Sequence, residues 1–92
     1  MPPTDTDALA HVILQFRQLA IQQLPVLEKE IRELISRKET DTRSIELLLG
    51  ILLSMLQYGV GKELFRLLHQ YYKNIDRWGF ITYQALSAGL LE

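Results

Sequence analysis

The sequence predicts an all-α fold, a small helical bundle of about four helices. Its most apolar segment is residues 44–58, where ten of the fifteen residues are large and apolar. A helix that is apolar on nearly every side is normally buried at the centre of a domain. Residues 8–35 carry apolar side chains at steps of three and four, which is the spacing of one helical face. Short polar segments separate the helical regions, so neighbouring helices are expected to lie antiparallel.

A long first helix is expected from Asp7 to Arg37, after a flexible lead-in of residues 1–6. Its apolar face contains Leu9, Val12, Ile13, Phe16, Ala20, Leu24, Leu27, Ile31, Leu34 and Ile35. Pro25 lies inside this helix and cannot donate a backbone hydrogen bond, so a kink is expected there. A straight helix of this length would extend about 46 Å, whereas a compact domain of this size has a radius of gyration of about 12 Å. The helix therefore either bends at Pro25 to wrap the core or leaves one end protruding for a partner, and the bend is the favoured prediction.

The central helix is expected over residues 43–58 and is predicted to form the core. A polar loop at residues 38–42 precedes it and supplies an N-cap, either Asp41 or Thr42. Gly59 suits the left-handed residue that ends a helix. The first helix after its kink and the two later helices are expected to cover most of its sides.

Two shorter helices are expected over residues 62–74 and 77–88, forming a C-terminal helical hairpin with Asp76 as the N-cap of the second. One face of the last helix carries Trp78, Ile81, Ala85 and Ala88. Residues 80–83 also suit a short strand, because β-branched and aromatic residues favour strands. The chain offers no partner strand, so a helix is predicted there.

The composition indicates one globular domain over residues 1–92. The chain is 48% apolar and 23% charged, has a net charge of −1 and contains no cysteine. This charge balance gives no electrostatic footprint for nucleic acid or an anionic membrane surface, so neither is expected as a partner. The central apolar run is shorter than the roughly 20 residues of a membrane-spanning helix. With no disulfide framework and no secretory signal, the expected location is cytoplasmic.

No arrangement of residues points to catalysis, a metal site or a cofactor, so a non-enzymatic protein is expected. His11 and His69 lack the spacing that places two ligands on one helical face. Residues 74–85 match an EF-hand loop in their Asn, Asp and Gly positions, but Trp78 and Ala85 occupy positions that require calcium ligands. The chain also has no Gly-x-Ser-x-Gly motif and no phosphate-binding loop. The last helix has too few basic or amide residues to read DNA bases.

Aromatic residues are concentrated in the second half of the chain, with seven of eight after residue 57. They cannot all point inward from two short helices, because consecutive residues such as Tyr71 and Tyr72 point about 100° apart. Tyr and Trp are enriched at protein interfaces, since each combines a large apolar area with a polar tip. The candidate interface residues are Tyr58, Tyr71, Tyr72, Trp78 and Tyr83, and their alternative role is to fill the core.

The first functional hypothesis is a non-catalytic protein–protein interaction or adaptor module that self-associates, most simply as a dimer. It rests on the central helix, because four helical segments do not easily cover a helix that is apolar on all sides. The alternative is a small regulator or inhibitor that docks on another macromolecule, an immunity-type or anti-defence protein. In length and four-helix layout the chain resembles bacteriocin immunity proteins. A third possibility is an enzyme or ligand carrier with a pocket lined by Tyr58, His69 and Trp78.

Overall fold

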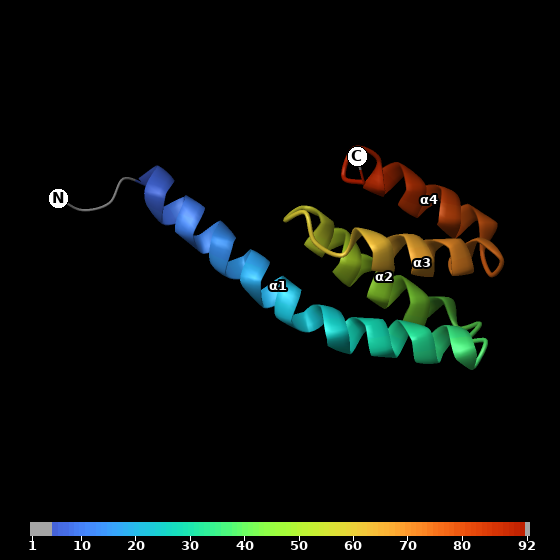
Figure 1. Ribbon diagram of the computed structural model, residues 1–92. Coiled ribbons are helices and arrows are strands. Elements are labelled where there is room, and N and C mark those ends of the chain that lie inside the picture. Colours follow the sequence, from blue (N-terminus) through green and yellow to red (C-terminus); the bar gives the residue numbers. More distant parts are fainter. Residues whose placement is uncertain (1–4, 92) are drawn as a thin grey trace.

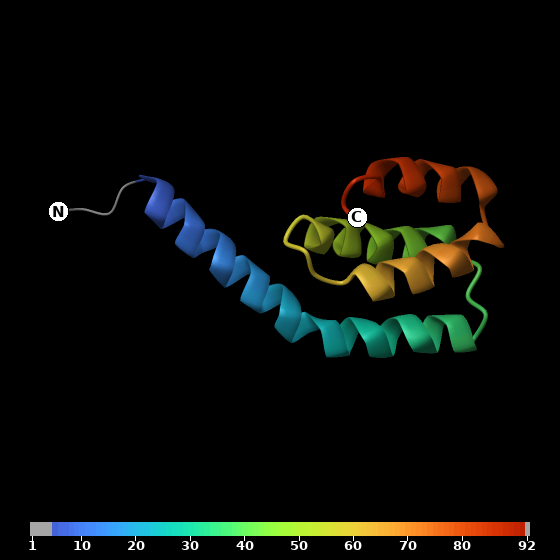
Figure 2. The same ribbon diagram turned by 45° about the horizontal axis from the view of Figure 1, so that its top comes forward.

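The computed structural model describes residues 5–91, which contain four helices and no strand. The helices are α1 (Asp5–Ser36), α2 (Thr42–Leu56), α3 (Lys62–Lys73) and α4 (Arg77–Ser87). Helices α2, α3 and α4 run up and down beside one another, and the C-terminal half of α1 packs along α2 and α3 (Figure 1, Figure 2). The all-α prediction is confirmed, and residues 80–83 are helical. The flexibility predicted for residues 1–4 lies outside the described residues, whereas residues 5 and 6 belong to α1.

The predicted signals for the ends of the helices are confirmed in the three turns. Asp41 is the N-cap of α2, and its carboxylate accepts a hydrogen bond from the Arg43 backbone N–H at 3.1 Å. Asp76 caps α4 in the same way, accepting from the Gly79 backbone N–H at 3.0 Å. Gly59 has a φ of 72°, so it provides the left-handed turn after α2. These caps satisfy backbone N–H groups that the first turn of a helix leaves unpaired.

Helix α2 lies at the centre of the fold, as predicted, and contacts each of the other three helices. The fully buried core side chains come from α1, α2 and α3: Ile31, Leu34, Ile45, Leu49, Leu52, Phe65, Leu68 and Tyr72. Burying one such large apolar side chain contributes about 1.5–3 kcal/mol. The other helices do not cover α2 completely, since Leu47 and Ile51 remain exposed.

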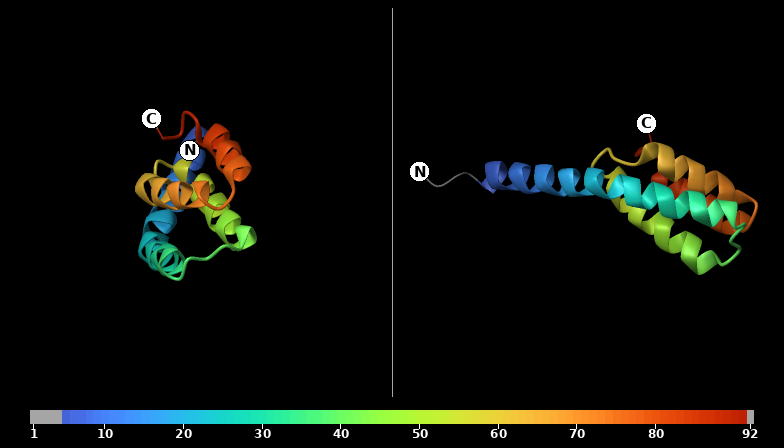
Figure 3. Two further views of the ribbon diagram at one scale, coloured as in Figure 1. Left: turned by 90° about the vertical axis from the view of Figure 1, so that its right-hand side faces the viewer. Right: turned by 60° about the horizontal axis from the view of Figure 1, so that its bottom comes forward.

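Helix α1 continues through Pro25 but changes direction near it, which is the kink predicted from the proline (Figure 2). The kink does not fold the whole helix over the core. Leu27, Ile31 and Leu34 are buried, whereas residues 8–19 are all exposed and extend beyond the other helices (Figure 3). The radius of gyration is consequently 15.3 Å and the longest dimension 55 Å. The prediction that α1 wraps the core is therefore wrong for its N-terminal half, which protrudes.

Helix α4 packs through a different face from its most apolar one. All four residues of the apolar face identified from the sequence are exposed: Trp78, Ile81, Ala85 and Ala88. Phe80 and Tyr83 are half-buried and Ser87 is buried. Gly79 explains this choice, because a Cβ at its position would overlap the hydroxyl of the buried Tyr72. Only a glycine allows α4 to approach α3 this closely, so the residues beside Gly79 are the ones that turn inward.

Candidate interaction surface

The protruding part of α1 is the most unusual surface of this protein. We call residues 8–21 the arm, and its apolar residues Leu9, Val12, Ile13 and Phe16 the stripe. Every large apolar residue of the arm is exposed, with exposed fractions between 42% and 60%. The stripe lies on the same helical face as Leu27, Ile31 and Leu34, which fill the core further along α1. A single apolar face thus begins in solvent and ends in the core.

The arm lacks the supports that normally hold a solvent-exposed helix. Its only charged residue is Arg17, so it contains no ion pairs of its own. One side-chain hydrogen bond, between Gln15 and His11 at 3.2 Å, joins residues one turn apart. Phe16 stacks on Tyr58 near the end of the arm, but a helix of this length with so little tertiary support is marginal in water. Its exposed apolar surface is therefore a candidate interaction surface.

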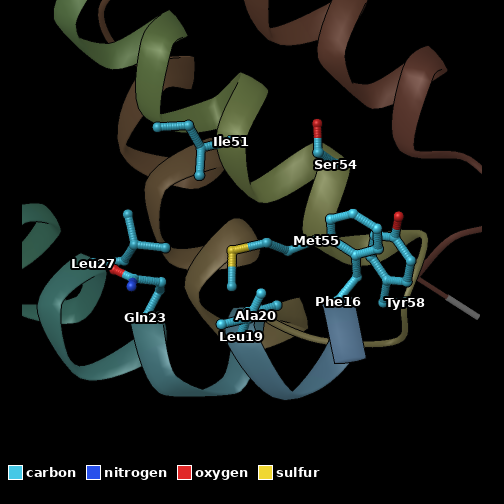
Figure 4. A pocket seen from close by; sticks show the side chains of 9 residues that line it. All are labelled: Phe16, Leu19, Ala20, Gln23, Leu27, Ile51, Ser54, Met55 and Tyr58. Atoms are coloured by element: carbon cyan, nitrogen blue, oxygen red, sulfur yellow. The ribbon is translucent and has the colours of Figure 1, made fainter. Parts of the chain in front are cut away.

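An apolar groove lies where the arm meets the core. It has a volume of about 350 Å³ and is lined by α1, α2 and Tyr58, which lies in the turn after α2. The lining residues are Phe16, Leu19, Ala20, Gln23, Leu27, Ile51, Ser54, Met55 and Tyr58 (Figure 4). The Phe16 and Tyr58 rings stack at one end, with centroids 6.2 Å apart. Leu27 and Ile51 lie at the other end (Figure 4).

The groove is apolar apart from Ser54, Gln23 and the Tyr58 hydroxyl, and two of its lining side chains are small. Ala20 and Ser54 have small side chains, which leave room for a backbone to approach. The Ser54 hydroxyl donates a hydrogen bond to the carbonyl of Gly50 at 3.2 Å, as expected for a serine inside a helix. This hydroxyl therefore brings no unpaired donor into the groove.

The five aromatic residues predicted as an interface do not form one surface. Trp78 is 80% exposed, but Tyr72 is completely buried, so its assignment to an interface is wrong. Tyr71 is half-buried, and its hydroxyl donates to the backbone carbonyl of Glu39 in the loop between α1 and α2. Tyr58 is half-buried in the groove, and Tyr83 packs edge-on against Tyr72. Three of these side chains therefore hold the bundle together, and only Tyr58 borders the groove.

Tyr72 anchors the contact between α2, α3 and α4. Its hydroxyl donates to the Glu46 carboxylate and lies 3.4 Å from an oxygen of Asp76. Burial raises the pKa of Tyr72 well above its ordinary value, and the hydrogen bond and negative charge of Glu46 raise it further. Burial likewise raises the pKa of Tyr83, with a smaller contribution from the charge of Glu46. A tyrosine held in its neutral form by these surroundings is a structural hydrogen-bond donor.

The two histidines differ in exposure and do not form a site together. His11 is exposed on the arm, whereas His69 is buried between two aromatic rings, 4.0 Å from the Phe80 centroid and 5.2 Å from that of Phe65. The Nε2 of His69 lies 2.8 Å from the carbonyl oxygen of Phe80. Because a carbonyl can only accept, this nitrogen carries the proton and is not free to bind a metal. Among residues 8–91, whose side chains the structure describes, no three His, Asp or Glu residues lie close enough together to hold a metal ion.

The pocket predicted from Tyr58, His69 and Trp78 is not formed. Tyr58 lines the groove between α1 and α2, while His69 lines a separate hollow between α3 and α4. Trp78 projects from α4 into solvent. These three side chains therefore cannot act on one ligand.

Comparison with known proteins gives no assignment. No protein family, curated protein or solved structure matches this chain. None of the described helices is long and apolar enough to cross a membrane. The surfaces that bear on function are therefore the arm, the groove and the exposed apolar residues of α4.

The stripe residues were identified in the sequence as a helical face but not as an interaction surface. The signal that pointed to them was the length of the first helix compared with the size of a compact domain. That comparison allowed either a helix that bends over the core or a helix with one protruding end. In the structure the N-terminal end protrudes.

Proposed function

We propose that this protein is a non-catalytic helical interaction module, an adaptor that self-associates as a dimer. The observation that carries the proposal is the arm, a helix with exposed apolar residues on nearly all sides. The largest apolar patch of a typical monomer covers about 300–600 Å² and is often functional. A large residue that is half exposed leaves roughly 80–100 Å² open. The seven such residues of the arm together leave roughly 600 Å² uncovered, before the groove is counted.

A dimer accounts for this surface more simply than an enzyme or a nucleic-acid-binding protein does. The arm and the groove carry almost no charge, so neither attracts phosphates or an acidic peptide. Homodimers with two-fold symmetry are the commonest assemblies, and their interfaces are more apolar than the remaining surface.

Sedimentation velocity of the purified chain, from low to high micromolar concentration, tests the proposal. The expected result is a reversible shift from the monomer mass of 10.7 kDa to twice that mass. A single monomeric species across the whole range contradicts it.

A second candidate function is that of a regulator that docks on another macromolecule through α4. The observation in its favour is that α4 exposes three large apolar side chains, those of Trp78, Ile81 and Leu86. Helix α4 makes no contact with α1, so this surface is separate from the arm. A toxin or phage gene beside the coding sequence supports this function, and a secretion or assembly operon supports the adaptor.

A further inference from the structure

We infer that the groove of each copy holds the arm of a second copy, and that the two arms lie antiparallel across a two-fold axis. This inference rests on the proposed function, since it specifies how the dimer is built. It commits to a second copy because the chain itself carries both halves of the contact. The stripe is an exposed apolar face of a helix, and the groove is an apolar trough long enough to take it.

The stripe is short enough to lie along the groove. The α1 wall of the groove runs from Phe16 to Leu27, which is about 16 Å at 1.5 Å per residue. The stripe runs from Leu9 to Phe16, about 10 Å on the same scale. The stripe therefore fits within the groove, with the rest of the length available for the residues that follow it.

Two-fold symmetry fixes the register. The arm of the partner must lie along the groove with its stripe beside residues 20–27 of α1. An antiparallel pair satisfies this for both copies at once if the axis passes level with Gln18, midway between residues 9 and 27. Leu9 of each copy then lies level with Leu27 of the other copy. The interface is isologous, because the same residues serve as ligand and as receptor.

The buried area reaches what a stable dimer needs. The apolar residues that become covered are Leu9, Val12, Ile13, Phe16, Leu19 and Ile51, all of which are exposed in one copy. At roughly 80–100 Å² each they supply about 500–600 Å² of apolar area per copy. If apolar atoms make up about 60% of an interface, the total is about 900 Å² per copy, close to the usual 800 Å².

Site-directed cross-linking tests the arrangement, and the absence of cysteine from the chain makes each introduced thiol unique. A Val12→Cys copy is mixed with an affinity-tagged Ser54→Cys copy and treated with a short bismaleimide. Val12 lies on the stripe and Ser54 in the groove, and both side chains are exposed. The control pairs Val12→Cys with Thr82→Cys, an exposed position on α4.

The expected result is a mixed dimer from the Val12 and Ser54 variants at a yield at least tenfold above that of the Thr82 control. Equal yields from the two pairs would contradict the inference that the groove of each copy holds the arm of the other copy. If cross-linking fails while sedimentation shows a dimer, the arm arrangement is wrong and the self-association stands. If sedimentation shows only monomer, the proposed function fails as well.

Discussion

Replacing Leu9 and Ile13 together with glutamine removes half of the stripe without disturbing the folded monomer. Both residues are exposed in one copy, at 60% and 45%, and surface substitutions usually change the free energy of unfolding by no more than about 0.5 kcal/mol. In the dimer four such side chains become covered. At about 25 cal/mol per Å² each could contribute about 2 kcal/mol. Incomplete covering and side-chain ordering reduce this to about 1 kcal/mol each.

The dimer should therefore lose about 4 kcal/mol, which raises its dissociation constant about a thousandfold. Sedimentation equilibrium measures this constant, and thermal unfolding at low concentration checks the monomer. The matched control replaces Leu14 and Ile21 with glutamine. These residues are 56% and 47% exposed but lie on the other side of the arm, outside the groove. Equal weakening by both pairs would refute the reasoning, because the effect would then follow hydrophobicity alone and not the stripe.

Three further predictions concern the bundle. Gly79→Ala should lower the free energy of unfolding by about 1–3 kcal/mol, because its Cβ would overlap Tyr72. Gly50→Ala has open space around its Cβ and should raise the free energy of unfolding by up to about 1 kcal/mol. Urea unfolding measures both changes. Burial raises the pKa of Tyr72 above its ordinary 10.0, so the stability that this group contributes should be fully present below pH 10 and should fall as the pH rises further. Tyr72→Phe leaves Glu46 without this donor, so it should lower the free energy of unfolding by about 1–3 kcal/mol at neutral pH and make the fall at high pH less steep. Trp78, the only tryptophan and 80% exposed, should show solvent-like fluorescence that iodide quenches freely, and a shielded, blue-shifted emission would contradict its placement.

Local signals were enough to predict most of the helical bundle. Asp41, Gly59 and Asp76 mark their helix ends because each acts through hydrogen bonds or backbone angles within a few residues. The central position of α2 followed from its composition, since a helix that is apolar on nearly every side is normally buried at the centre of a domain.

The surfaces were harder to predict because they depend on how the helices meet. A periodic face identifies a helix, but it does not say how far along that helix the core extends. The stripe and the buried residues after Pro25 are indistinguishable in the sequence. On α4, the single close approach of Gly79 to Tyr72 overrides the more apolar face and leaves Trp78 outside. The burial of Tyr71 and Tyr72 was likewise not predictable, because it depends on the hydrogen-bond acceptors that Glu39 and Glu46 supply from other parts of the chain.

Hydrogen exchange of the backbone amides in residues 8–21, measured at high and low protein concentration, tests the central claim most directly. If a second copy covers the arm, these amides should exchange slowly where the dimer forms and rapidly after dilution to the monomer. The amides of α2 should remain protected at both concentrations, because the core of the bundle lies within one copy. Rapid exchange throughout the arm in a protein that is dimeric would contradict the account.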